Sequence, residues 1–449
     1  MPSAISTVAP EVAPRGRALA DAAERLIPGG VNSATRSIGV PYAFSSGDGA
    51  NLVDADGRSY VDYHAAFGAI LLGYRCDLVD EAVHRAVRDA KFFGIGVTDL
   101  EVELARRVVD AIPSAEMMIA TMSGSEAVSQ AVRLARAATG RPLLVKFQGG
   151  FHGSNDAVAR NVISAPEKAY GDDPLSAGIL PDAFHSTLVA EFNDLESVRT
   201  LFELHPDRIA AVILEPIPHN VGALLPTAAF VEGLRALTSD NGALLVFDEV
   251  ITGFRHAFGG YQEICGVHPD LTTFGKGMAN GYPIGGLAGS RHLMERFDGR
   301  GGDVLLAGTF NGHPVGVGAA IATIDYLAGN PSFYQRTYEL GDAMRSGLRD
   351  IVTELDIEAT VAGFGGVFSL YFTSGPIRGY RDLMSNDDVA YSTFHRRMTD
   401  AGFLMIPLAL KRNHVSGAHT REHIDDTLTA ARSVLKGMRD DGTIGAARR

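Results

Sequence analysis

Two short apolar segments, each ending in a charged residue, constrain the fold of this chain most strongly. Residues 242–247 (GALLVF) run into Asp248, and residues 271–275 (LTTFG) run into Lys276. Charged side chains are rarely buried without a partner, so such segment ends predict a binding cleft. In parallel sheets, the carboxyl ends of the strands open onto the crevice where α/β proteins bind ligands. We therefore expect Asp248 and Lys276 to lie together at one edge of a parallel sheet.

The order of the remaining segments predicts an α/β fold with two domains. Strands expected at 210–214 and 243–247 bracket a helix at 228–239, and this alternation is typical of a parallel sheet with helical crossovers. A chain of 449 residues exceeds one typical core. We predict an N-terminal arm with part of a small domain in residues 1–75, a large domain in residues 76–330 and the rest of the small domain in residues 331–449.

Composition excludes several classes of protein. The formal net charge of −13, without any run of basic residues, argues against a nucleic-acid-binding protein. Two cysteines, Cys76 and Cys265, are too few for a disulfide framework, which favours a reducing cytoplasm. The first residues lack the pattern of a signal peptide, and no segment approaches the roughly 20 apolar residues of a membrane span.

A Ser-Gly-Ser sequence follows a strand expected at 117–120 and precedes a predicted helix. Ser123, Gly124 and Ser125 would present hydroxyls, free backbone N–H groups and the positive end of a helix dipole to an anion such as phosphate. A plain serine N-cap gives the same local sequence.

Lys276 and Asp248 together match the needs of pyridoxal phosphate (PLP). A lysine can hold this cofactor as a Schiff base, and a carboxylate that faces the ring nitrogen keeps it protonated, which makes the ring an electron sink. Phe151 and His152 lie in a glycine-flanked loop. Phe151 and Val250 could enclose the cofactor ring from its two faces, although the loop could equally serve turn packing.

Other charged residues allow a structural or a functional interpretation. Glu215 ends an apolar strand and is either a structural carboxylate or part of the site. Arg36 and Arg412 are ordinary surface arginines or substrate ligands. His419 and His423 have helical spacing, but the carboxylate of a zinc-binding helix is missing, so we predict no metal.

At this point the motifs resemble those of the class III, fold-type I PLP enzymes, in the branch of glutamate-1-semialdehyde 2,1-aminomutase. The resemblance spans nearly the whole chain. It rests on IPGGVNSATR (27–36), SGSEA (123–127), GGFHG (149–153), EPIPHNVG (215–222), FDEVITGFR (247–255), GKGMANGYPIGG (275–286) and AGTFNGHP (307–314). It implies a large, mostly parallel-sheet domain and a smaller α/β domain formed from both chain ends.

The resemblance also assigns roles by position. Lys276 would be the Schiff-base lysine, Asp248 the partner of the ring nitrogen, and Gly124 with Ser125 the phosphate cradle. Thr309 would reach the phosphate of the other subunit, which implies a homodimer with shared active sites. The full predicted cofactor site comprises Ser123, Gly124, Ser125, Phe151, His152, Glu215, Asn220, Asp248, Val250, Lys276 and Thr309.

Departures from the family pattern concentrate on the substrate side. Phe67 stands where the aminomutases have Trp, and Lys411 stands where they have Glu, whereas Arg36 matches their carboxylate-binding Arg. The segment that corresponds to their mobile gating loop, residues 164–181, also differs. We therefore assign Arg36, Phe67, Lys411 and Arg412 to the substrate.

This pattern favours an aminotransferase that acts on a small amine and a small carbonyl compound. An aminomutase must retain its intermediate under a lid, whereas a transaminase must release one product and admit a second substrate. The substrate would be a specialised metabolite, either a β-amino acid or, as in antibiotic biosynthesis, the amino sugar of an aminoglycoside. The alternatives are glutamate-1-semialdehyde 2,1-aminomutase and a PLP-binding protein without catalysis.

Overall fold

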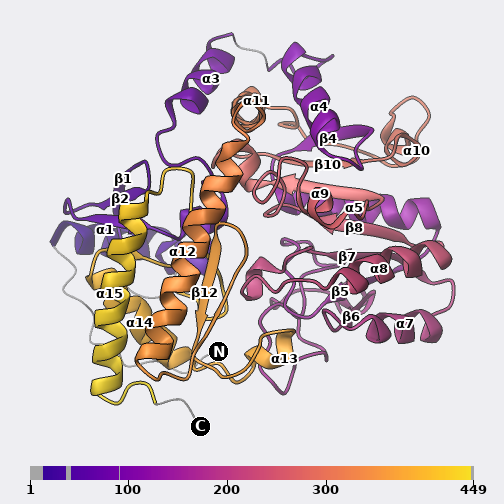
Figure 1. Cartoon of the computed structure of the whole chain (residues 1–449). Coiled ribbons are helices and arrows are strands. Elements are labelled where there is room, and N and C mark those ends of the chain that lie inside the picture. The colour runs from indigo at the N-terminus through magenta and orange to yellow at the C-terminus, as the bar shows by residue number, and fades with distance from the viewer. Residues whose placement is uncertain (1–13, 37–41, 90–91, 446–449) are drawn as a thin grey trace.

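The computed structural model describes residues 14–36, 42–89 and 92–445; residues 1–13 of the predicted arm lie outside these ranges. A seven-stranded sheet forms the centre of the larger part, and a layer of helices and small sheets lies beside it (Figure 1). The strands of the central sheet are β4 (Met117–Thr121), β5 (Leu143–Phe147), β6 (Thr187–Ala190), β7 (Ile209–Leu214), β8 (Leu244–Asp248), β9 (Leu271–Gly275) and β10 (Gly285–Gly289).

The direction of these strands confirms the predicted mostly parallel sheet. Their order is β4-β10-β9-β8-β7-β5-β6, and the neighbouring pairs from β9 to β6 are parallel. Only β10 runs antiparallel to its neighbours β4 and β9. Consequently β4, β5, β7, β8 and β9 all end at the same edge, where their following residues meet.

Helices cover both faces of the sheet, which explains why a central strand such as β7 is continuously apolar. In β7, Ala211 and Ile213 pack in the cluster that contains α5 (Gly124–Thr139). Val212 and Leu214 point the other way, into the cluster with α7 (Leu195–Leu204) and α8 (Ala228–Asp240). Parallel strands buried on both faces show this pattern in place of a polar alternation.

A third apolar cluster supports the turn that carries Lys276. The helix α11 (Pro314–Gly329) packs against α3 (Asp77–Arg88), α4 (Asp99–Ala111) and the short 3₁₀ turn η4 (Lys276–Ala279). Met278 and Ala279 of this turn are fully buried among these helices. The packing therefore fixes the backbone that directs Lys276 toward the strand ends.

Both ends of the chain build the smaller layer, as the predicted fold class requires. The antiparallel strands β1 (Phe44–Asp48), β2 (Asn51–Asp54) and β3 (Ser59–Asp62) continue into β13 (Phe403–Leu404), which pairs parallel with β3. A second sheet contains β11 (Thr360–Ala362), β12 (Val367–Tyr371) and β14 (Asn413–His414). The helices α12 (Ser332–Glu354), α14 (Asp388–Asp400) and α15 (Arg421–Asp440) complete the layer. The domain boundaries at 75/76 and 330/331 stay predictions.

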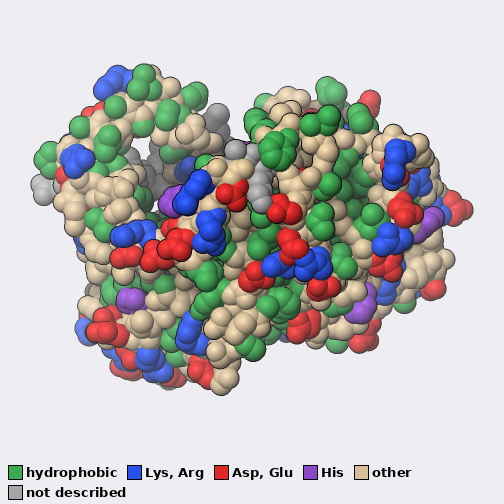
Figure 2. All heavy atoms as spheres, turned by 90° about the horizontal axis from the view of Figure 1, so that it is seen from above, with side chains coloured by type: hydrophobic (Ala, Val, Ile, Leu, Met, Phe, Trp, Pro, Cys, Tyr) green, Lys and Arg blue, Asp and Glu red, His purple; other side chains and the backbone are tan. Residues whose placement is uncertain are grey.

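Shorter helices lie in the connections and at the N-terminus. They are α1 (Pro14–Leu26), η1 (Pro28–Gly30), η2 (Ala34–Arg36), α2 (Ala65–Gly68), α6 (Pro181–His185), η3 (His219–Val221), α9 (Tyr261–Cys265), α10 (Arg291–Met294), η5 (Glu295–Phe297) and α13 (Tyr380–Leu383). In residues 14–36, 42–89 and 92–445, no helix has both the length and the apolarity to cross a membrane. On the face seen in Figure 2, acidic and basic side chains are interspersed.

Gly222 joins the two layers and provides a test of this packing. It ends η3 with a φ of 84°, and a Cβ at this position would lie 1.0 Å from Oη of the buried Tyr371 on β12. Gly222→Ala should therefore lower the free energy of unfolding by about 3 kcal/mol, from the clash together with the left-handed backbone. Denaturant unfolding measures this loss.

Gly140 is the matched control for that substitution. It ends α5 with a φ of 68°, and a Cβ at this position would have no other atom within 4 Å. Gly140→Ala should cost only about 1 kcal/mol, from the backbone conformation alone. Equal losses in the two variants would contradict the contact between Gly222 and Tyr371.

Candidate active site

One cavity of about 400 Å³ collects most of the residues that the sequence assigns to the cofactor. The predicted residues among its lining are Ser123, Gly124, Ser125, Phe151, His152, Glu215, Asp248, Val250 and Lys276. Ala69, Met122 and Tyr282 also line it, and the sequence does not predict them. The predicted residues end or directly follow β4, β5, β7, β8 and β9, so the shared direction of these strands brings them together.

Lys276 follows β9 directly, in a left-handed conformation with a φ of 47°. Burial lowers the pKa of its amine to about 8, and the nearby Arg412 guanidinium contributes to this shift, while Asp248 and Glu215 oppose it. A strained backbone conformation at a non-glycine residue is a common feature of functional sites. Lys276 can therefore supply a neutral amine near neutral pH, which a solvated lysine does not.

Asp248 is buried and accepts hydrogen bonds on both carboxylate oxygens. His152 Nδ1 lies 2.7 Å from Oδ2, and Thr273 Oγ1 donates to Oδ1 at 3.1 Å. Because a carboxylate only accepts, the Nδ1 of His152 carries the proton in this pair. The Val250 N–H also donates to Oδ1, at 3.2 Å, so these contacts orient the carboxylate and leave Oδ2 with capacity for a further donor.

The Ser-Gly-Ser turn combines a helix cap with a close approach of the backbone. Ser123 is the N-cap of α5, and its Oγ accepts the Glu126 N–H at 3.3 Å. The hydroxyl of Ser123 therefore acts as the helix N-cap that the sequence also allowed. Gly124 has a separate requirement, because a Cβ there would lie 2.7 Å from Val250 Cγ2. Gly124 thus permits close packing against Val250, and the start of α5 lines the cavity, where its N–H groups could meet an anion.

The loop that carries Phe151 is held from two sides. Glu215 accepts the Phe151 N–H at 2.8 Å, and Lys146 Nζ donates to the Gly150 carbonyl at 2.8 Å. Both side chains are buried, and burial lowers the pKa of Lys146 to about 7. Glu215 thus makes the contacts of a structural carboxylate and also lines the cavity, so the structure agrees with both interpretations of this residue.

Lys146 is not among the residues predicted from the sequence, although its position inside an apolar strand is unusual for a lysine. This lysine interrupts an otherwise apolar strand, Leu143–Phe147, whose residues are all buried. A charged residue inside such a strand needs internal acceptors, and Lys146 finds two, the carbonyls of Gly150 and Arg160.

Three of the four predicted substrate residues lie together. Lys411 Nζ is 5.4 Å from the centroid of the Phe67 ring, and Arg412 Nη2 donates to the Phe67 carbonyl at 2.9 Å. Arg412 is only 3% exposed, so the surface interpretation of this residue is wrong. Burial lowers the pKa of Lys411 to about 8, and Arg412 and Lys276 contribute to this shift. Because these groups shift one another's pKa, the cationic side chains of Lys276, Lys411 and Arg412 lie near one another.

The remaining predicted residues do not line this cavity, although Arg36 lies close enough to His64 to contribute to the lowering of its pKa. Arg36 is exposed at the end of η2, and Asn220 donates from Nδ2 to the Gly149 carbonyl at 3.3 Å, behind the aromatic loop. Thr309 is exposed and lines another cavity of about 420 Å³ with Phe92, Phe93 and Ile95. Their predicted roles therefore stay predictions.

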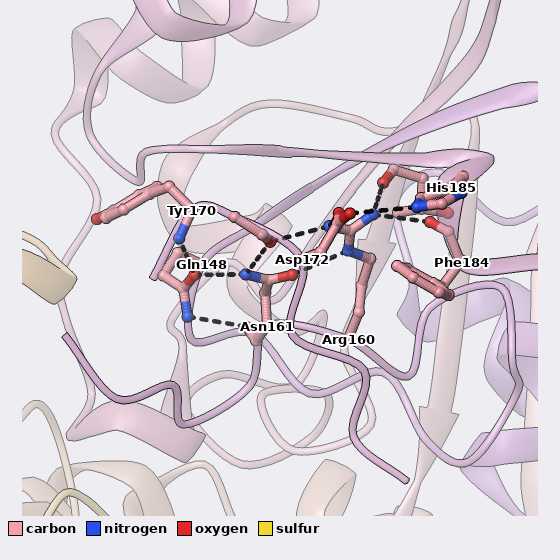
Figure 3. Close-up of polar contacts among 9 residues, drawn as sticks. Gln148, Arg160, Asn161, Tyr170, Asp172, Phe184 and His185 are labelled. Atoms are coloured by element: carbon pink, nitrogen blue, oxygen red, sulfur yellow. Dashed lines mark hydrogen bonds and ion pairs between the residues drawn. The ribbon is translucent and has the colours of Figure 1, made fainter. Parts of the chain in front are cut away.

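The segment that follows the aromatic loop is fastened by a buried arginine (Figure 3). Arg160 donates to the carbonyls of Phe184 and Thr187 at 2.8 and 2.9 Å, and to Asp172 at 3.0 Å. A second set of contacts joins Asn161, Gln148 and the Tyr170 N–H. Residues 170–172, within the segment 164–181, are thus held by hydrogen bonds to Arg160, Asn161 and Gln148.

The two histidines considered as metal ligands have other contacts. His419 Nδ1 accepts the Ser416 N–H at 3.0 Å, and His423 Nδ1 accepts the Thr420 N–H at 3.2 Å. Across the described ranges, no group of three or more His, Cys, Asp and Glu side chains is arranged to hold a metal ion.

Known proteins resemble this chain over nearly its whole length. The aminotransferase class-III family model matches residues 33–425. Glutamate-1-semialdehyde 2,1-aminomutase of Methanothermobacter thermautotrophicus is 39% identical over 419 residues, which cover 93% of this chain and 98% of that protein. An omega-transaminase from Sphaerobacter thermophilus superimposes with a TM-score of 0.89 at 31% identity, over 95% of this chain and 98% of that one. A solved transaminase with PLP bound gives a TM-score of 0.87 at 28% identity, over 97% and 100% of the two chains.

The lowered pKa of Lys276 leads to a pH-dependent prediction. Only the neutral amine attacks an aldehyde, so the cofactor-free protein should bind PLP covalently at a rate that rises as the pH increases through about 8. A solvated lysine would place this midpoint near its ordinary pKa of about 10.4. Stopped-flow absorbance of the lysine-bound cofactor measures the rate. Lys276→Ala is the control and should give no such band, while a midpoint above about 10 would contradict the burial of the amine.

Proposed function

The chain belongs to the class III aminotransferase family of PLP-dependent enzymes, and we propose that it moves an amino group on a small carboxylate-bearing substrate. The observation that carries this proposal is the pairing of Lys276 and Asp248 at one cavity with a cationic group of side chains, Lys411 and Arg412, close by. The relatives named glutamate-1-semialdehyde 2,1-aminomutase make this isomerisation the first candidate, whereas the sequence pattern alone places it second.

The residues of the cavity fit PLP. Ser123, Gly124 and Ser125 line the cavity at the start of α5, where their backbone N–H groups and hydroxyls would face the cofactor phosphate. Asp248 offers a carboxylate to the ring nitrogen, and Phe151 and Val250 would contact the ring. When bound, the cofactor supplies an electron sink for bonds at the amine-bearing carbon. Lys276 would hold it covalently.

The chain's own residues would then handle the proton. Burial lowers the pKa of the Lys276 amine to about 8, so once an incoming amine has released it, a useful fraction would be neutral near neutral pH. Nζ can therefore accept a proton from the substrate carbon and return it to a neighbouring atom. Asp248, held by His152 and Thr273, keeps its charge directed at the ring. Lys276 would thus move the proton, while Asp248 would hold its charge at the cofactor ring.

The local charge supports an anionic substrate over an amino sugar. Lys276, Lys411 and Arg412 interact with one another, and two buried carboxylates, Glu215 and Asp248, face them. A polycationic aminoglycoside would meet Lys411 and Arg412 with the same sign of charge. A carboxylate would instead accept hydrogen bonds from Arg412, whose planar guanidinium suits it.

A transaminase remains a second candidate, and the segment of residues 164–181 favours it. An isomerase has to close over its substrate between the two half-reactions. Here Arg160 and Asn161 tie this segment down through several hydrogen bonds, and Lys411 and Phe67 lie on the substrate side where the aminomutases have Glu and Trp. The resemblance to an omega-transaminase is in agreement with this candidate.

One experiment separates the two candidates. The enzyme in its pyridoxamine form is mixed with glutamate-1-semialdehyde and no other amine, and the product is followed by chromatography. Formation of 5-aminolevulinate over many turnovers is expected for the aminomutase, because the amino group returns to the same carbon skeleton. A single turnover that stops, and resumes when an amine donor is added, would assign the transaminase.

The face around Thr309 supports a homodimer with shared sites. Phe93, Ile95 and Phe310 are 64%, 85% and 53% exposed, which is unusual for large apolar side chains grouped in one region. We infer that a second copy of the chain covers them and brings Thr309 to the partner's cofactor phosphate.

Ile95→Asp tests this assembly. A buried carboxylate at the interface should convert the dimer to a monomer and weaken PLP retention at least about tenfold, because the partner's Thr309 is lost from the phosphate. Sedimentation velocity and cofactor titration measure the two effects. The control is Leu204→Asp, at an exposed apolar residue on α7. Dimers of both variants with equal PLP affinity would rule out this interface.

A further inference from the structure

Two contacts fix the guanidinium of Arg412 and leave part of it free. Nε donates to His414 Nε2 at 3.0 Å, and Nη2 donates to the Phe67 carbonyl at 2.9 Å. A guanidinium has N–H groups along two edges, and these two bonds use the edge formed by Nε and Nη2. In the described ranges, no acceptor is bonded to Nη1, so the edge that contains Nη1 keeps donor capacity.

His414 is a neutral acceptor in this contact. Arginine can only donate, so His414 Nε2 must carry a lone pair and Nδ1 the proton. Full burial lowers the pKa of this imidazole well below its ordinary value, and the charges of Arg255 and Arg412 add to the shift. The ring is confined as well, because it stacks parallel to His219 and because a Cβ at Gly68 would lie 2.7 Å from His414 Nε2.

The second acceptor is held by a strained turn. Ala65, Ala66 and Phe67 have φ values of 47°, 48° and 58°, a left-handed turn that costs about 1 kcal/mol or more per residue. The carboxylate of Asp62 stabilises this turn, because it accepts hydrogen bonds from the N–H groups of His64 and Ala65 at 2.8 and 3.0 Å.

Two further donors complete the support of the turn. Tyr74 donates from its hydroxyl to Asp62 at 2.7 Å, and Arg255 donates to the Gly68 carbonyl. The direction of the Phe67 carbonyl, and with it the direction of Arg412, is therefore set by buried groups.

We propose that His414 is a positioning residue that, with the Phe67 carbonyl, engages one edge of Arg412 and thereby presents the other edge to the substrate carboxylate. This inference rests on the proposed function, in which the substrate carries a carboxylate. Arg412 then works with a preset geometry, so little side-chain freedom is lost when the carboxylate binds.

Binding of butanoate to the PLP-loaded enzyme tests the proposal, with butanamide as the uncharged probe of the same shape. The dissociation constant is measured by calorimetry and by the change in cofactor absorbance. His414→Phe keeps the ring but removes the acceptor, so it should weaken butanoate binding roughly tenfold, the usual effect of losing one hydrogen bond to a charged group. Butanamide binding should not change.

His414→Gln is the matched control, because its side-chain oxygen can accept from Arg412 Nε. This variant should bind butanoate nearly as the parent does. Arg412→Leu should also weaken butanoate binding, and His414→Phe should add nothing further in that background, because the histidine acts only through the arginine.

The outcomes separate the inference from the proposed function. If the parent does not bind butanoate, or Arg412→Leu binds it equally well, the carboxylate assignment fails. If Arg412→Leu weakens binding but His414→Phe does not, or if His414→Phe has its full effect without Arg412, the positioning role is overturned while the proposed function stands. If His414→Phe fails to fold, Tyr74→Phe serves as the second variant, because it removes a hydrogen bond that supports the turn carrying Phe67. It should weaken butanoate binding by a few-fold. An unchanged affinity for butanoate would equally overturn the positioning of Arg412.

Discussion

Compensation of buried charge is the constraint on which this structure depends. Asp248, Glu215, Lys146 and Arg412 are all nearly inaccessible to solvent, and an isolated charge in such a place would cost several kcal/mol. Each of them is met by a specific donor or acceptor: His152 for Asp248, the aromatic loop for Glu215 and Lys146, and His414 for Arg412. The same contacts that make burial tolerable also fix the direction of each side chain.

The two layers contribute different parts of the site because they have different topologies. Parallel strands deliver Asp248, Lys276 and Glu215 to one edge of the central sheet, which places the groups that fit the cofactor. The smaller layer supplies Lys411, Arg412 and the turn that carries Phe67. The residues that we propose to face the cofactor thus come from the central sheet, whereas Phe67, Lys411 and Arg412, which we propose to face the substrate, come from the two ends of the chain.

The side chains beside the cavity include a cationic group, although the net charge of the whole chain is negative. The net charge is −13, and acidic and basic side chains are interspersed on the outer face seen in Figure 2. Beside the cavity, however, Lys276, Lys411 and Arg412 lie close enough for the cationic neighbours to lower the pKa of each lysine. Because short-range interactions in a desolvated site outweigh distant, screened charges, the acidic surface does not argue against the anionic substrate that we propose.

The sequence by itself determined that Asp248 and Lys276 meet at one cavity and that the chain belongs to the class III aminotransferase family. Apolar strands that end in Asp248 and Lys276 predict their meeting, since a parallel sheet aligns its carboxyl ends whatever the loop lengths, and the ordered motifs identified the family. The sequence could not show that Arg412 is buried, that Lys146 holds the aromatic loop, or that Arg36 stays exposed at the end of η2. Nor could it show the antiparallel direction of β10 or the left-handed turn at Ala65–Phe67. The burial of Arg412 depends on a contact with Phe67, 345 residues away in the chain, and only tertiary packing decides that such segments meet. The other features depend on backbone directions and hydrogen bonds that residue type alone does not specify.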